Sequence, residues 1–161
     1  MAEREIDLFY AGSDTMYVRR KIRPLEEELK RRGLNVVWLR EKVPFEKFVE
    51  YLKNSKVVLS PEGAGWHCFR HYEALAAGAV PVINRPEDGL YTDIVEGKTA
   101  WFYDDVEDAA RIVEEVVRDD RSLAMNLQQC MDFAKQHHYT QMGERIIREL
   151  VDEKTTEQEV E

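Results

Sequence analysis

The amino-acid sequence predicts an α/β domain in which a parallel sheet carries helices on both faces. Three observations lead to this prediction: short apolar runs alternate with helical periodicity, glycines follow the helical segments, and the 161-residue length fits one domain. We expect a single Rossmann-like domain over residues 1–151. The polar residues 152–161 are expected to form a disordered tail, because one apolar residue in ten cannot support a core.

The first segments predict a strand followed by a helix. Residues 6–10 form an apolar run that ends in Ala11-Gly12-Ser13, as expected of a buried strand entering a loop. Apolar residues then recur at helical spacing, namely Val18, Ile22, Leu25 and Leu29. Pro24 interrupts this pattern, so the helix is predicted from residue 24 onward, with Gly33 as its C-terminal cap.

The next stretch predicts a second strand, a helix and a third strand. The second strand is the apolar run 36–39, and the third is 57–60, which ends at Pro61. Pro44 suits the first position of the helix between them, where its missing N–H has no cost. The apolar face of this helix consists of Phe45, Phe48, Val49 and Leu52. We expect Phe45 and Phe48 in the core, together with Trp38 and Trp101.

The rest of the chain predicts two more strands and four helices. A short helix over 69–77 ends at Gly78, and strands follow at 80–83 and 99–102. Apolar periodicity predicts three C-terminal helices, around residues 106–117, 123–134 and 140–151. We expect the strand order 2-1-3-4-5, because it places the loops after the first and third strands side by side. In such sheets ligands bind at the carboxyl ends of the strands, where the order reverses.

The composition disfavours several function classes. Lys plus Arg number 23 against 32 Asp plus Glu, a formal charge of −9, whereas nucleic-acid and anionic-membrane binding need a cationic surface. No apolar run approaches the roughly 20 residues that span a bilayer, and the charged residues 1–7 argue against a secretory signal. Cys68 and Cys130 fit no metal-binding spacing. We therefore expect reduced thiols in a cytoplasmic protein.

Residues 60–83 are dense in residues that packing alone does not require. Gly63 and Gly65 let the backbone approach a ligand closely, and the following helix directs its positive end at an anion such as a diphosphate. Arg70, in the first turn, has a planar donor fork that suits phosphate oxygens. Glu73 lies three residues on, on the same face, where its carboxylate can accept both hydroxyl protons of a ribose. The alternative is a surface Arg–Glu pair on an ordinary helix.

This segment resembles the donor-nucleotide motif in the C-terminal domain of GT-B glycosyltransferases, particularly the exostosin-like and glycosyltransferase group 1 branches. The resemblance is carried by Phe69-Arg-His-Tyr-Glu-Ala-Leu-Ala-Ala-Gly78 and Val80-Pro-Val-Ile83, and it continues less specifically through 93–97, 101–102 and 133–139. It implies a nucleotide-diphosphate sugar donor, such as a UDP or GDP sugar, bound without a metal ion. It also implies one half of a GT-B arrangement, completed by an acceptor-binding partner subunit or by a homo-oligomer.

The resemblance implies that Glu73 binds the ribose and that Arg70 faces the diphosphate, as do Gly12 and Ser13. Arg19, Arg20 and Arg23 follow the first strand, and among them we favour Arg20 as a further cation. Many retaining members carry a second glutamate eight positions before the ribose glutamate, where this chain has Gly65. Glu62 is the nearest acid and is a candidate to act near the transferred sugar, with loop capping as the alternative.

Two further residues have open roles. Trp66 either lines a sugar site or covers the sheet edge. His71 is either a base, with a pKa near working pH, or a packed histidine.

Three functions stay open at this point. The first is a glycosyltransferase donor half that works with a partner subunit or by self-association. The second is a nucleotide-binding or regulatory module without transferase activity. The third is a flavin-nucleotide binder in which Ser13-Asp14-Thr15 holds a phosphate, although this function gives Arg70 and Glu73 no use.

Overall fold

The computed structural model of the protein describes residues 4–13, 15–87 and 93–136. A five-stranded parallel sheet runs through it in the order β2-β1-β3-β4-β5, which confirms the predicted fold class and strand order. The strands are β1 (Ile6–Ala11), β2 (Val36–Leu39), β3 (Ser55–Leu59), β4 (Val80–Asn84) and β5 (Trp101–Tyr103). In the register of the central strand, Phe9 pairs with Val37 on one side and Val58 on the other.

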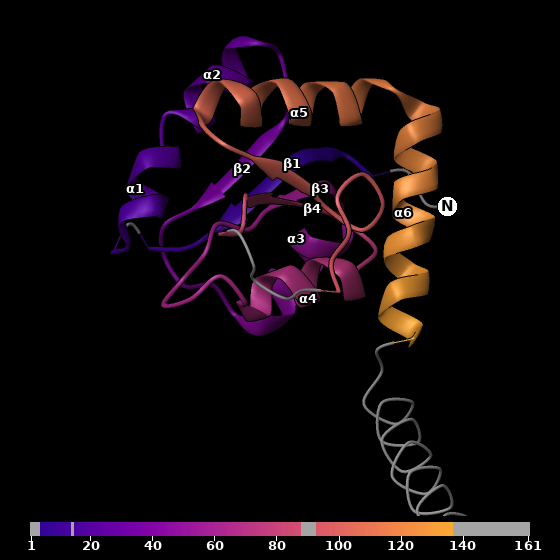
Figure 1. The fold of residues 1–161 in the computed structure, drawn as a ribbon. Coiled ribbons are helices and arrows are strands. Elements are labelled where there is room, and N and C mark those ends of the chain that lie inside the picture. The colour runs from indigo at the N-terminus through magenta and orange to yellow at the C-terminus, as the bar shows by residue number, and fades with distance from the viewer. Residues whose placement is uncertain (1–3, 14, 88–92, 137–161) are drawn as a thin grey trace, which may run out of the picture.

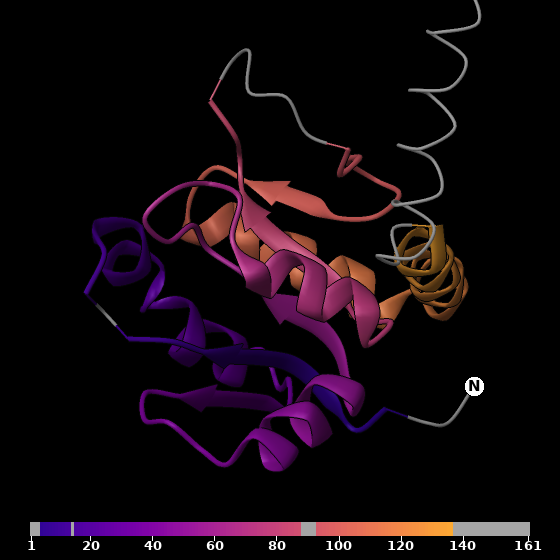
Figure 2. The same cartoon turned by 90° about the horizontal axis from the view of Figure 1, so that it is seen from below.

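Helices cover both faces of the sheet (Figures 1 and 2). One face packs against α2 (Leu25–Arg31) and α5 (Val106–Arg118), and the other against α3 (Phe45–Lys53) and α4 (Phe69–Ala76). The long α6 (Asp120–Gln136) contacts both α4 and α5 at the end of the sheet where the strands begin. The short α1 (Tyr17–Ile22) lies at the opposite end, where the strands finish (Figure 1).

The strands are apolar because both faces of the sheet are buried. Successive side chains point to opposite faces, so Val57 and Leu59 join the large core under α2 and α5, whereas Val58 joins the smaller core under α3 and α4. Burial on both sides explains why these strands are continuous apolar runs in the sequence rather than alternating ones.

The structure corrects two predictions about the helices. Residues before Pro24 are also helical, since α1 ends at Ile22 and α2 begins at Leu25. Pro24 is the N-cap residue of α2, a position where no N–H is required. Phe45 is 71% exposed rather than in the core, since it is the first residue of α3 and lies at the rim of the sheet. Phe48 is half-buried, and Trp38 is buried as predicted.

The predicted helix 140–151 and the tail 152–161 lie outside the described residues. Among the helices that are described, none combines the length and the apolar character needed to cross a membrane.

Two predicted glycine caps are confirmed. Gly33 ends α2 with φ +83°, and Gly78 follows α4 with φ +68°, a conformation that side-chain-bearing residues rarely adopt. A Cβ at Gly33 would meet nothing within 4 Å. At Gly78 it would lie 2.9 Å from Cγ of Met131 and 3.1 Å from Nη2 of Arg4. Arg4 in turn donates to the Ala77 carbonyl oxygen at 2.8 Å, so this turn is packed on both sides.

These two glycines make a matched pair for a stability test. We expect Gly33→Ala to lower the free energy of unfolding by about 1 kcal/mol, through backbone strain alone. We expect Gly78→Ala to lower it by about 1–3 kcal/mol more, because the new methyl group also clashes with Met131. Urea unfolding at pH 7 measures both. Equal losses would mean that α6 does not pack against this turn.

Candidate functional site

The candidate site lies at the carboxyl end of the sheet, where the loops after β1 and β3 meet. Gly12 and Ser13 lie in the first loop, and Glu62, Gly63 and Gly65 lie in the second. Arg70 connects the two sides, because its Nη1 donates to the carbonyl oxygen of Ala11. The juxtaposition expected from the strand order is therefore present.

Arg70 is held by three contacts. Besides the Ala11 carbonyl, its Nε donates to Oε2 of Glu73 at 2.9 Å, and its guanidinium carbon lies 4.8 Å from the centre of the Phe48 ring. Arg70 and Glu73 thus share one helix face as predicted, with side chains 26% and 40% exposed. A guanidinium fixed in this way loses little conformational freedom when it binds an anion.

Two cavities meet at Arg70. The first, which we call the α3 cavity, has a volume of about 510 Å³. It is lined by Ala11, Gly12, Ser13, Arg40, Glu41, Lys42, Val43, Phe45, Phe48 and Arg70. The second, the central cavity, has a volume of about 80 Å³. It is lined by Tyr10, Ala11, Gly12, Arg19, Leu59, Ser60, Pro61 and Arg70.

Both cavities are locally cationic, although the chain as a whole is acidic. The α3 cavity has Arg40, Lys42 and Arg70 against one acid, Glu41. The central cavity has Arg19 and Arg70, and the described residues that line it include no acid. Like-signed charges in a concave wall raise the local concentration of counter-ions. These two cavities are therefore suited to an anionic ligand.

Gly12 lines both cavities, and the space beside it leaves no room for a side chain. A Cβ at this position would lie 2.6 Å from Oη of Tyr10, so a larger residue would displace the tyrosine. Ser13 is exposed, and its hydroxyl is 3.0 Å from Oγ1 of Thr15. Gly65 is different, since a Cβ there would meet nothing within 4 Å.

His71 lies in the interior, a position that favours a packed histidine over a base. It is fully buried, and both ring nitrogens are bonded: Nε2 to the Trp66 carbonyl oxygen at 2.6 Å and Nδ1 to the Ser60 hydroxyl at 2.7 Å. A carbonyl oxygen only accepts, so Nε2 carries the proton and Nδ1 accepts from Ser60. Burial lowers the pKa of His71 to about 4. A ring enclosed in this way has no nitrogen left for a substrate.

Trp66 is buried, a position that favours covering the sheet edge over lining a sugar site. It is 7% exposed, its ring packs edge-on against Phe102, and its Nε1 donates to the Asn84 carbonyl oxygen at 2.7 Å. Glu62 pairs with the Asn84 side chain, which receives the Glu62 N–H at 2.8 Å and donates to Oε2 at 3.0 Å. The Glu62 carboxylate is therefore held in place at the rim of the loop.

The sequence left two residues of this site without their role: Arg19 was a candidate but not the favoured one, and Phe45 was expected in the core. Arg19, rather than the favoured Arg20, lines the central cavity, and its Nε donates to the Glu62 carbonyl oxygen at 3.2 Å, whereas Arg20 is exposed. The other is Phe45, which lines the α3 cavity. The predicted position of Phe45 at the start of a helix could have indicated this, because the helices that follow strands in a parallel sheet begin at its carboxyl edge, where ligands bind. Within the described ranges, no three His, Cys, Asp or Glu side chains gather as metal ligands.

We expect the His71 ring to stay neutral down to about pH 4. An unfolded histidine titrates near 6.5, so the unfolded chain takes up this proton first and stability falls as pH drops from about 6.5 towards 4. The slope from this residue is at most about 1.4 kcal/mol per pH unit. NMR titration of the imidazole nitrogens measures the pKa directly, and His71→Gln should flatten the urea-unfolding profile between about pH 4 and 6.5. Titration near pH 6.5 in the folded protein would restore His71 as a candidate base.

Comparisons with known proteins agree with the resemblance noted in the sequence. The profile of the RXYLT1 C-terminal domain family matches residues 29–93, a range that contains Arg70 and Glu73. Among solved structures, a chain of the crystal structure of the GtfA/B complex matches with a TM-score of 0.57 and 13% identity. The match covers 94% of this chain and 37% of that chain, and at this identity it shows the fold alone. No curated protein sequence matches this chain significantly. Over residues 29–93, the chain is therefore similar to the RXYLT1 C-terminal domain family, a family of GT-B glycosyltransferase C-terminal domains.

Proposed function

We propose that this domain binds a nucleotide-diphosphate sugar donor and supports glycosyl transfer as one half of a GT-B arrangement. The observation that carries the proposal is the position of Arg70, which is fixed where the α3 cavity meets the central cavity. A ligand that extends through both cavities has Arg70 near its middle. A nucleoside diphosphate fits this charge pattern, because its anionic part lies between a planar base and a sugar.

The diphosphate is assigned to the central cavity and its junction with the α3 cavity. Arg19 and Arg70 both reach this position, and both can form paired hydrogen bonds to phosphate oxygens. The start of α4 adds to the attraction, since its first turn has no acidic residue and its N-cap residue makes no side-chain hydrogen bond. These positive groups also stabilise the negative charge that develops on the leaving diphosphate during transfer.

The nucleoside is assigned to the α3 cavity. Glu73 has one carboxylate oxygen bonded to Arg70 and remains 40% exposed, so it can accept ribose hydroxyl protons from the position that Arg70 fixes. The exposed ring of Phe45 on the cavity wall offers an apolar face on which a planar base can stack. Such stacking does not discriminate strongly between bases, so the identity of the base is left to experiment.

A partner is proposed because the carboxyl edge of the sheet is rich in exposed apolar side chains. Those at or beside the first turns of α1, α3 and α4 are Met16, Tyr17, Phe45, Phe69 and Tyr72. Phe69 alone is 88% exposed. Apolar side chains gathered around a ligand site are typical of a surface that another domain or subunit covers. The matched chain in the GtfA/B complex is longer than this one, which is consistent with a second half on the same or another chain. We propose that the assembly is cytoplasmic.

The test of this function is a thermal-shift panel of UDP, GDP, ADP, their common sugar conjugates and FMN, with and without Mg²⁺. A ligand at 100 times its dissociation constant adds about 2.7 kcal/mol, which raises Tm by roughly 5–10 °C in a domain of this size. We expect a metal-independent shift with one nucleoside diphosphate. A shift with FMN alone would favour the flavin alternative, and no shift with any nucleotide would contradict donor binding by this chain.

Variants at Arg70 and Glu73 separate the two assigned roles. We expect Arg70→Ala to weaken a nucleoside diphosphate by about 1.5–3 kcal/mol and the bare nucleoside far less, because only the diphosphate bonds to the guanidinium. We expect Glu73→Ala to weaken both ligands by about 1–3 kcal/mol, through the ribose that they share. Isothermal titration calorimetry measures each affinity.

The matched controls are Arg111→Ala and Glu115→Ala, which break a similar exposed ion pair on α5 at 2.9 Å. They should leave nucleotide affinity unchanged. An equal loss for diphosphate and nucleoside in Arg70→Ala would show that Arg70 only supports the fold. An unchanged affinity in Glu73→Ala would remove the ribose assignment.

A further inference from the structure

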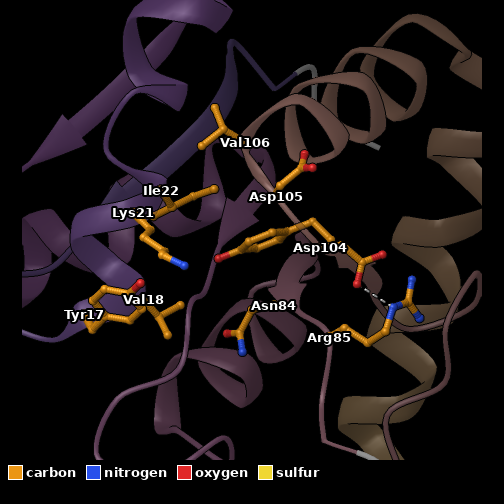
Figure 3. A pocket seen from close by; sticks show the side chains of 10 residues that line it. Tyr17, Val18, Lys21, Ile22, Asn84, Arg85, Asp104, Asp105 and Val106 are labelled. Carbon is orange, nitrogen blue, oxygen red and sulfur yellow. Dashed lines mark hydrogen bonds and ion pairs between the residues drawn. The ribbon is translucent and has the colours of Figure 1, made fainter.

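A third cavity opens on the same edge of the sheet but on the side of α1. This α1 cavity has a volume of about 500 Å³. It is lined by Tyr17, Val18, Lys21, Ile22, Asn84, Arg85, Tyr103, Asp104, Asp105 and Val106. Figure 3 shows the α1 side chains on one side and Asn84, at the end of β4, across from them, with the paired Arg85 and Asp104 farther away on the opposite side. None of the functions assigned above uses this space.

A buried hydroxyl in the wall of the α1 cavity lacks a partner. Tyr103 is 3% exposed, and its Oη makes no hydrogen bond within the described part of the chain. Burial raises the pKa of Tyr103, so the phenol keeps its proton and can donate it. An unsatisfied buried hydroxyl is costly, and natural proteins keep few of them. The Oη atom is closed to solvent in this structure, so a ligand hydroxyl in the cavity would satisfy it after a small displacement of the surrounding side chains.

The charges around this cavity cancel, unlike those of the α3 cavity. Lys21 and Arg85 are matched by Asp104 and Asp105, and Arg85 is paired with Asp104 at 2.9 Å (Figure 3). Such a wall gives an anion no net attraction. Arg85 is occupied by Asp104 and by Glu96, to which its Nη1 donates at 3.1 Å. The wall still offers both donors and acceptors, since the Lys21 ammonium donates and the carboxylates accept. A neutral ligand with several hydroxyl groups can use both kinds.

The remaining lining of the cavity is apolar. Val18, Ile22 and Val106 supply aliphatic surface, and Tyr17 adds an aromatic ring that is 61% exposed. A sugar ring has one face of C–H groups and a rim of hydroxyls, so it matches a wall that combines apolar and polar groups. This is the usual composition of a small-molecule pocket, with a few polar groups that fix orientation.

We propose that the α1 cavity binds a neutral carbohydrate, with the Tyr103 hydroxyl bonded to one of the sugar's hydroxyl groups. Asn84 connects this cavity with the donor site, because it lines the α1 cavity and its side chain is hydrogen-bonded to Glu62. A sugar here would lie on the far side of the Glu62 loop from the α3 cavity. Its identification as the acceptor, rather than the sugar of the donor, rests on the proposed function. Carbohydrate binding itself does not.

The test is a ¹H–¹⁵N NMR titration of the full 161-residue chain. The probes are the neutral methyl glycosides of glucose, galactose, mannose and N-acetylglucosamine, with inorganic phosphate as the anionic comparison. We expect at least one glycoside to shift the amides of Lys21, Asn84 and Asp105, and phosphate to leave them unchanged. A response to phosphate but to no glycoside, or no response to any probe, would overturn the proposal.

Tyr103→Phe removes only the hydroxyl group. We expect it to weaken glycoside binding about 3- to 10-fold, the equivalent of one hydrogen bond, while Tm stays the same or rises. Tyr51→Phe is the matched control, because it removes a tyrosine hydroxyl from α3 on the opposite face of the sheet and should not change glycoside affinity. Unchanged affinity in Tyr103→Phe would overturn the role of the hydroxyl group.

A nucleotide titration of the same sample separates this proposal from the proposed function. Donor binding should shift the amides of Gly12, Ser13 and Arg70. If only the glycosides bind, the carbohydrate site stands and the donor assignment fails. If a nucleotide sugar shifts the α1-cavity amides that the matching nucleoside diphosphate leaves unchanged, the cavity holds the donor's sugar and the acceptor assignment is wrong.

Discussion

The buried hydrogen bonds of His71 determine the shape of the loop between β3 and α4, and the candidate site depends on that loop. Ser60 at the end of β3, Trp66 in the loop and His71 on α4 are joined through one imidazole ring that is inaccessible to water. A neutral histidine satisfies a donor and an acceptor at once, so neither Ser60 nor the Trp66 carbonyl is left unpaired in the interior. The next residue to His71 is Arg70, and the same clamp therefore fixes the helix start from which Arg70 reaches Ala11.

The carboxyl edge of the sheet is divided into regions of different charge. On the side of β1, β2 and α3, the cavities carry an excess of arginine and lysine. On the side of α1, β4 and β5, cations and anions are equal in number. Asn84 and Glu62 form the boundary, because their side chains bond to each other between the two regions. An acidic chain with a net charge of −9 can therefore attract an anion at one position and a neutral ligand at another.

The rim of this edge supports the view that the domain works against another surface. Its exposed aromatic residues lie where helices begin, and in a parallel α/β domain those positions surround the ligand site. Phe45 and Phe69 are each the first residue of a helix, and both are far more exposed than an aromatic residue usually is. Apolar surface at these positions lowers the solubility of an isolated domain, so its presence is consistent with a partner that covers it.

The sequence by itself determined the fold class, the strand order, the two glycine caps and the shared face of Arg70 and Glu73. Three of these follow from local patterns, because apolar runs, helical spacing and positive-φ glycines are properties of neighbours along the chain. The strand order followed instead from the expectation that the loops after the first and third strands meet at one ligand site. Only the tertiary structure decided that His71 is enclosed, that Phe45 is exposed, that Arg19 rather than Arg20 lines a cavity, and that Tyr103 has an unpaired hydroxyl. Each of these residues lies at or near the end of an element. Periodicity reports which face of an element is buried, but at its ends the environment comes from loops that are distant in the sequence.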